Sequence, residues 1–256
     1  MPSNNLSNLL IRNYPYSKLD RWSLDFDGSN DRLDAGDITV FDGLSDMSIS
    51  VWIKASDSAS GTNPIVTKGS YNADGASFHL NYNPGSNSGR LSFSVERDSN
   101  HLSGDGEGMY AYYNSVGSDI DGKWAHILVS YSNTNDALAL YINGSAETIN
   151  STSGTFIDIP NSSSTFQIGN GFLGNISDVA IYNTDLSASL ATTIYNNGNG
   201  YPHNTGKASG NLIGWWRMGD GKENGTGTTI YDESSNSNNF TLTNMDAASD
   251  YEADTN

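Results

Sequence analysis

Segment 27–31, with the sequence DGSND, has the residue types that best suit metal binding. Calcium binds about six to eight oxygen atoms from carboxylates, amides and backbone carbonyls. Because Asp27 and Asn30 offer such oxygen atoms within one short turn, the segment predicts a structural calcium site. The alternative is an Asx-type turn, in which the Asp27 side chain accepts hydrogen bonds from the backbone that follows it.

Tyrosines are the residues that best suit sugar binding. Tyr110, Tyr112 and Tyr113 lie close together in the sequence, and Tyr71 and Asn72 form a second aromatic and amide pair. A tyrosine ring offers an apolar face and a polar tip, which suits the two sides of a sugar ring. These residues predict a glycan-binding surface. The alternative is ordinary packing of tyrosines over the edge of a sheet.

The sequence lacks the catalytic motifs of common hydrolases. A glycosidase needs two carboxylates flanking the scissile bond, but the glutamates are all isolated and the E-x-D-x-E strand motif of the related glucanases is absent. No G-x-S-x-G motif is present, and the absence of cysteine excludes thiolate sites and disulfides. The histidines lack the spacing of a zinc site; they are His79, His101, His126 and His203. The sequence therefore predicts a protein that is not an enzyme.

The net charge and the hydropathy of the chain limit the classes of partner that it can bind. The net charge is −17, from 29 acidic and 12 basic side chains, and such a surface repels a phosphate backbone. No apolar run reaches the roughly 18 residues of a membrane span. Residues 1–22 have no charged segment followed by an apolar one. We therefore expect no nucleic-acid partner, no membrane insertion and no signal peptide.

The candidate binding residues must be positioned by short segments in which apolar and polar side chains alternate. Apolar side chains recur at every second position between turns rich in glycine, asparagine and aspartate, which predicts antiparallel strands that form a sandwich. The Asn143-Gly144 pair predicts a hairpin turn. Inner-face residues of the predicted strands are Ile49, Val51, Ile53, Ile127, Val129 and Leu140.

One helix is predicted at residues 188–195. Ser187 can cap its start, and residues 196–198 (NNG) can end it. Leu190 and Ile194 are four positions apart and share a face, so the helix should dock on the sandwich. The fold class that follows is an all-β antiparallel jelly-roll sandwich with one short helix.

Several motifs, in this order, resemble the LamG-like jelly-roll domains of the concanavalin A-like lectin/glucanase superfamily. The motifs are LDFDGSND at 24–31, ISVWIK at 49–54, DGKWAHI at 121–127, LYING at 140–144 and GNISDVAIY at 174–182. The resemblance covers residues 22–200, and Ala125 stands where the family often has histidine. In this family the oxygen-rich turn often meets an acidic residue on a late strand. The resemblance thus adds Asp178 to Asp27 and Asn30 as a calcium ligand.

The sequence divides into an N-terminal arm (1–21), the sandwich (22–200) and a tail (201–256). The tail resembles a segment that in this family usually precedes the first strand, whereas here it follows the whole domain. Its runs 212–218 and 240–242 are too apolar to stay in water. We expect them to complete a sandwich, either this chain's own or that of a neighbouring copy, and the second arrangement would give a homo-oligomer.

Chains with this kind of tail are similar to virion-associated proteins of marine bacteriophages. The leading hypothesis is a non-enzymatic virion surface protein, a capsid decoration or a tail-fibre component. It would assemble in the host cytoplasm, contact other virion proteins or copies of itself, and bind host or environmental polysaccharide. The first alternative is an extracellular carbohydrate-binding or adhesion module of a bacterial surface protein. The second is a glycan-active hydrolase.

Overall fold

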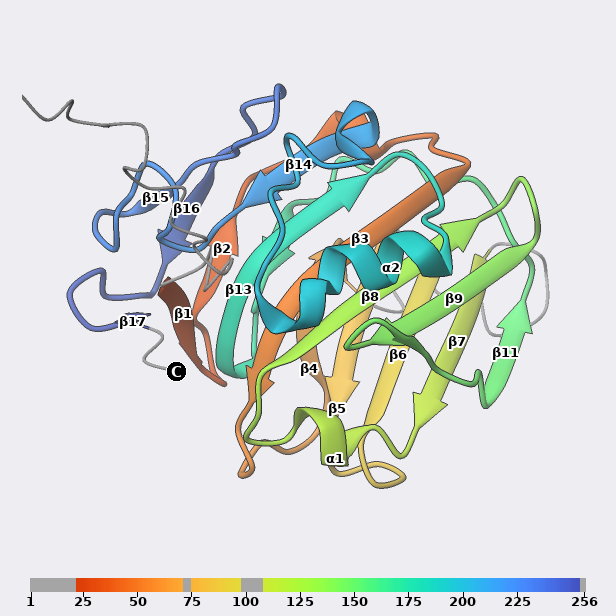
Figure 1. Ribbon diagram of the computed structural model, residues 1–256, viewed down its shortest axis with the longest axis horizontal. Coiled ribbons are helices and arrows are strands. Elements are labelled where there is room, and N and C mark those ends of the chain that lie inside the picture. The colour runs from red at the N-terminus through yellow and green to blue at the C-terminus, as the bar shows by residue number, and fades with distance from the viewer. Residues whose placement is uncertain (1–21, 71–74, 98–107, 254–256) are drawn as a thin grey trace, which may run out of the picture.

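The computed structural model describes residues 22–70, 75–97 and 108–253. Two antiparallel sheets pack face to face (Figure 1), so the predicted all-β sandwich is confirmed. The expected arm at 1–21 lies outside the described residues. None of the described helices is long and apolar enough to cross a membrane.

Sheet A has eight strands in the order β10-β9-β8-β3-β13-β1-β17, with β14 also pairing with β13. Its strands are β1 (Trp22–Asp27), β3 (Asp46–Ala55), β8 (Ala125–Ser132), β9 (Ala137–Ile142), β10 (Ser145–Ala146), β13 (Leu173–Tyr182), β14 (Leu212–Trp216) and β17 (Tyr251–Ala253). Asn143 and Gly144 connect β9 to β10 with φ values of 50° and 75°, which is the hairpin turn that their sequence predicts.

Sheet B has nine strands in the order β11-β7-β6-β5-β4-β12-β2-β16-β15. Its strands are β2 (Arg32–Asp34), β4 (Asn63–Lys68), β5 (Phe78–Asn83), β6 (Arg90–Glu96), β7 (Gly108–Asn114), β11 (Ser151–Gly154), β12 (Phe166–Ile168), β15 (Thr229–Ile230) and β16 (Phe240–Thr243). The helical elements are α1 (Gly117–Ile120), α2 (Ala188–Tyr195), and the short 3₁₀ turns η2 (Thr39–Phe41), η4 (Asn196–Gly198) and η5 (Ser209–Asn211).

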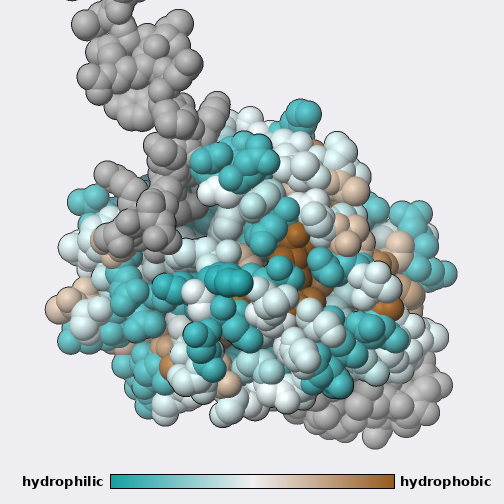
Figure 2. Space-filling model, turned by 60° about the horizontal axis from the view of Figure 1, so that its bottom comes forward, coloured by the Kyte–Doolittle hydropathy of each residue, from teal (hydrophilic) through white to brown (hydrophobic). Residues whose placement is uncertain are grey.

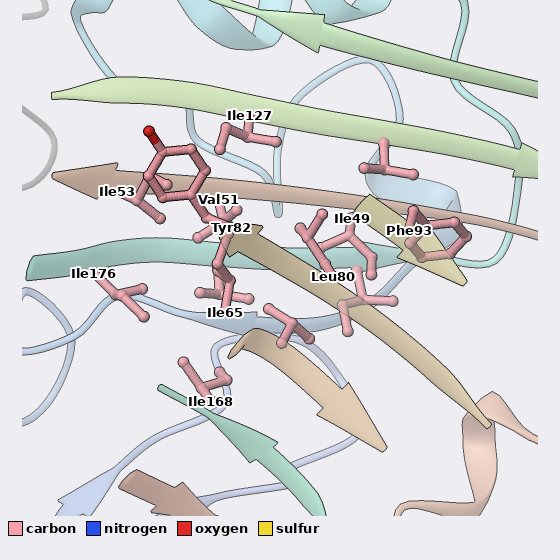
Figure 3. Close-up of a cluster of buried hydrophobic side chains, with 14 of the residues drawn as sticks. Ile49, Val51, Ile53, Ile65, Leu80, Tyr82, Phe93, Ile127, Ile168 and Ile176 are labelled. Carbon is pink, nitrogen blue, oxygen red and sulfur yellow. The ribbon is translucent and has the colours of Figure 1, made fainter. Parts of the chain in front are cut away.

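The main core lies between the sheets, where alternate residues of each strand point inward. Val51 and Ile127 are fully buried partners on neighbouring strands, and Leu80 and Phe93 face them from sheet B (Figure 3). The six predicted inner-face residues all belong to this core. Polar residues therefore fall on the two outer faces, and the end of the molecule in Figure 2 shows apolar side chains only in small patches.

Helix α2 begins and ends where the sequence predicts. The Ser187 side chain accepts a hydrogen bond from the Leu190 amide, and Asn196 closes the helix in the left-handed conformation. Ala191 and Ile194 are buried and Leu190 packs beside them. The helix thereby covers the outer face of sheet A (Figure 1).

The tail strands pair within the same chain. β14 pairs with the second half of β13, β16 pairs with β2, and β17 pairs with β1. Trp216 is fully buried and contacts the rings of Phe166 and Phe240 at centroid distances of 5.7 and 4.9 Å. Most of the apolar side chains of the tail strands thus belong to the main core of this sandwich, whereas Leu212 and Trp215 pack in a second cluster beside α2.

Candidate functional site

The outer face of sheet B carries two rows of polar and aromatic side chains. Phe78, Leu80 and Phe93 are buried in the core, so the residues between them on β5 and β6 point outward. The strand register places one row across the sheet: Thr67, His79, Ser94 and Tyr110. A second row contains Asn81, Ser92 and Tyr112.

Most members of these rows line a hollow of about 400 Å³ on the outer face, and Ser94 and Tyr112 lie beside it. Its lining is rich in amides and hydroxyls and, among the described residues, contains no aspartate or glutamate. The lining includes Thr67, His79, Asn81, Asn83, Arg90, Ser92, Tyr110, Gln167 and Asn170. Such a surface can hydrogen-bond a polyhydroxylated ligand without offering it a carboxylate.

Two tyrosines and one arginine form the aromatic part of this face. The rings of Tyr110 and Tyr112 have centroids 6.0 Å apart. The guanidinium carbon of Arg90 lies 4.4 Å from the centroid of the Tyr112 ring, which is a cation–π contact. Arg90 Nε also donates a hydrogen bond to Asn114 Oδ1 at 3.2 Å. These contacts hold the Tyr112 ring against the sheet.

The other predicted glycan-binding residues are placed differently. Tyr113 lies between Tyr112 and Asn114 on β7, and because successive side chains of a strand point to opposite faces, it points into the core. There it is 1% exposed. Burial, followed by the influence of Tyr141, raises the pKa of its hydroxyl well above the usual range. Tyr113 therefore cannot reach a ligand on this face. Tyr71 and Asn72 lie outside the described residues.

A buried acid and histidine pair lies beside the hollow, and sequence reasoning missed it. His79 Nε2 is 3.2 Å from Glu96 Oε1, which also accepts a hydrogen bond from Ser94 Oγ at 3.1 Å. Both His79 and Glu96 are at most 1% exposed. The pair fixes the imidazole at the floor of the hollow. Its only sequence signal was that both residues occupy outward positions.

The oxygen-rich turn after β1 is organised by its own backbone. Asp27 Oδ1 accepts hydrogen bonds from the amides of Ser29, Asn30 and Asp31 at 2.8, 3.3 and 3.5 Å. Asp31 Oδ2 in turn accepts one from the amide of Asp27 at 3.1 Å. This is the Asx-type arrangement that was the alternative to a metal site.

Asp178 does not join that turn. Asp27 pairs with Leu173 at the start of β13, whereas Asp178 lies at a bulge farther along that strand, with φ 47°. Its Oδ1 accepts a hydrogen bond from Trp215 Nε1 at 2.5 Å, and its Oδ2 is 3.1 Å from His203 Nε2. Within the described ranges, no three His, Cys, Asp or Glu side chains gather to hold a metal. Asp27, Asn30 and Asp178 thus form no common site, and calcium binding stays a prediction.

Asp178 instead belongs to a buried network on the outer face of sheet A. His203 Nδ1 is hydrogen-bonded to the Tyr182 hydroxyl, and Asp178 and His203 are each 1% exposed. Burial alone would raise the pKa of Asp178, but the charge of His203 and the hydrogen bonds from His203 and Trp215 hold it below its ordinary value. The network fastens the segment before β14 to the sheet. Because Asp178 and His203 are buried beneath that segment, a ligand cannot reach them.

Comparison with known proteins supports the same fold. Residues 27–190 match the model of the concanavalin A-like lectin/glucanases superfamily. Among curated protein sequences, none matches this chain significantly.

Three solved structures are similar. A Bacteroides ovatus protein, proposed to bind carbohydrate, has a TM-score of 0.61 and 17% identity over 91% of this chain. The chain spans 60% of that protein's length. A heptameric SAP-like pentraxin from Limulus polyphemus has a TM-score of 0.50 and 17% identity, covering 70% of this chain and 83% of its own. The binding domain of botulinum neurotoxin serotype D has the same score and identity, with coverage of 68% and 42%.

Proposed function

This chain belongs to the concanavalin A-like lectin/glucanases superfamily, and on that premise we propose that it is a non-enzymatic carbohydrate-binding protein. We place the glycan on the outer face of sheet B. The observation that carries this proposal is the hollow in which Tyr110 and Arg90 stand beside a floor of amides and hydroxyls.

The chemistry of the hollow matches a sugar. The apolar C–H face of a pyranose packs on an aromatic ring, while its hydroxyls exchange hydrogen bonds with amide and hydroxyl side chains. Tyr110 supplies a ring within the hollow, Tyr112 supplies a second ring beside it, and Asn81 is one of the lining amides. The net charge of −17 repels polyanions, so we expect neutral oligosaccharides.

A virion surface is the setting that we propose for this activity. The support is the resemblance of the tail to virion-associated proteins, together with the position of that segment after the domain. As a capsid decoration or tail-fibre component, the protein would contact other virion proteins. Mass spectrometry of purified phage particles tests this setting, and an adhesin of a bacterial surface is the alternative outcome.

The binding proposal is tested with a glycan array, followed by calorimetry on the best neutral ligand. Tyr112→Ala should weaken binding by about 5- to 150-fold, because loss of one stacking ring costs on the order of 1–3 kcal/mol. Tyr231→Ala is the matched control, since Tyr231 lies in the tail against Lys222. Unchanged affinity in Tyr112→Ala would contradict the site. Release of hydrolysis products would contradict the non-enzymatic assignment.

A further inference from the structure

The loop between β14 and β15 wraps around one carboxylate. Glu223 is 5% exposed, and its Oε1 accepts a hydrogen bond from the amide of Tyr231. The loop is closed by a hydrogen bond from the Gly225 amide to the Gly219 carbonyl at 2.9 Å. The Thr226 hydroxyl donates to the Glu223 carbonyl at 2.9 Å. The position of Glu223 Oε1 is therefore explained by the fold of the loop.

The second oxygen of Glu223 has no such explanation. Glu223 Oε2 and Glu233 Oε1 are both buried and have no hydrogen-bond partner. Both oxygens border the same small space. A Cβ placed on Gly221 would lie 2.7 Å from the first and 2.9 Å from the second, so the absence of a side chain at Gly221 keeps this space open.

Two buried, unpartnered carboxylate oxygens beside one space are unfavourable unless something lies between them. An ionised carboxylate only accepts hydrogen bonds, and burial without a partner costs free energy. Two cationic side chains of this segment make contacts of their own. Lys222 Nζ lies 5.4 Å from the Tyr231 ring centroid, and Arg217 Nη1 donates to the Asp220 carbonyl at 3.1 Å.

We propose that a divalent cation such as calcium binds between Glu223 Oε2 and Glu233 Oε1. Backbone carbonyls and water would complete its all-oxygen shell. Because only two carboxylates contribute, the affinity should be weak, with a dissociation constant of about 10⁻⁴–10⁻³ M. The site is independent of the glycan face and of the turn at Asp27.

The cation would also tie two parts of the tail together. The amide of Glu233 donates to the Trp215 carbonyl at 2.7 Å, so Glu233 is fixed to β14. Glu223 belongs to the loop that leads to β15. Burial raises the pKa of Glu223 and the nearby charge of Glu233 adds to this, against the hydrogen bonds of the loop. A bridging cation would relieve that repulsion and stabilise the tail.

The first test is thermal unfolding of the chelator-treated full chain with added calcium chloride, against sodium chloride of equal ionic strength. Calcium at about ten times its dissociation constant should raise Tm by about 3–6 °C, because only the folded state binds it. Glu233→Gln should abolish this rise. Asp136→Asn, which changes an exposed carboxylate in the turn between β8 and β9, is the control and should keep it. A rise that survives Glu233→Gln, or no rise in the parent, overturns the proposal.

The second test does not depend on unfolding. Terbium can replace calcium at an all-oxygen site, and nearby Trp215 should sensitise its luminescence. The signal should fall to background in Glu233→Gln and stay unchanged in Asp136→Asn. If calcium and terbium have no effect but Glu233→Gln raises Tm, the two carboxylates share a proton instead, and the cation proposal is wrong.

Discussion

The two outer faces of the sandwich begin from the same sequence pattern and differ in what covers them. On sheet A, α2 and the segment before β14 lie over the strands (Figure 1), and His126 and Asp178 are at most 1% exposed. On sheet B, the outward residues border a hollow of about 400 Å³. Tyr110 and Tyr112 remain partly exposed there.

The cover decides what the polar side chains do. Under it, they must pair with one another, because a buried polar group without a partner is costly. His126 Nε2 accordingly lies 2.9 Å from Ser50 Oγ, and Asp178 is bound by His203 and Trp215. Beside the hollow, hydrogen-bonding groups can stay available to a ligand. Substitutions on the first face should therefore affect stability, and those on the second should affect binding.

The largest effect should come from Val51→Asp, which removes the support of both faces at once. Val51 is fully buried between the sheets. An unpaired charge there costs several kcal/mol, on the order of the whole stability of a domain. Circular dichroism should show loss of the folded state. A variant that melts like the parent would contradict the central position of β3.

Asp178→Ala should cause the next largest loss of stability, and it changes only the covered outer face of sheet A. It leaves the Trp215 and His203 ring N–H groups buried without an acceptor, at a cost of about 3–5 kcal/mol. Urea unfolding measures this loss. Asp178→Asn is the control: it keeps an acceptor for Trp215 and tolerates the positive φ, so it should lose less. Glycan affinity should be unchanged in any Asp178 variant that folds.

Acid should also destabilise the covered face through His126. Burial, then the charge of His203, lowers the pKa of His126 from 6.5 to about 3, while Asp178 acts in the opposite direction. Between these two pH values the unfolded chain binds a proton that the folded chain does not. Stability from this group is therefore full above pH 6.5 and is lost as pH falls toward 3, by about 1.4 kcal/mol per pH unit.

Comparison of the parent with His126→Gln measures this dependence. The variant cannot titrate, so its unfolding free energy should fall less steeply between pH 6.5 and 5. Other groups, including the carboxylates, titrate in both proteins and cancel in the difference. Equal slopes for the two proteins would mean that His126 is protonated in the folded state.

The sequence predicted the parts of the molecule that depend on local pattern. Alternation identified the inner residues of β3 and β8, and Ser187 and Asn196 marked the ends of α2. Local pattern also separated Tyr112 from Tyr113 in principle, because neighbours on a strand face opposite ways. The prediction that grouped them overlooked this alternation.

Features that depend on long-range register could not be predicted. The resemblance placed Asp178 with Asp27, but the bulge in β13 and the return of the tail put it beside His203 and Trp215. The His79–Glu96 pair required knowledge that β5 and β6 are neighbours. Likewise, the sequence left open whether the tail strands pair in the same chain, since an apolar strand fits any free sheet edge.

The smallest stability effect should come from Arg90→Ala on the uncovered face. Arg90 contacts the Tyr112 ring at 4.4 Å and Asn114 at 3.2 Å, but all three residues are partly exposed. Cation–π contacts at such sites contribute about 0.5–1 kcal/mol, so the free energy of unfolding should fall by less than about 1 kcal/mol. Glycan affinity should fall more, because the Tyr112 ring loses the group that holds it flat and the hollow loses a donor. Arg90→Lys sharpens the comparison: it keeps the charge but not the planar fork, so it should preserve stability and restore binding only in part. If Arg90→Ala instead destabilised the fold as strongly as Asp178→Ala, this face would be part of the structural support, and the contrast between the two faces would fail.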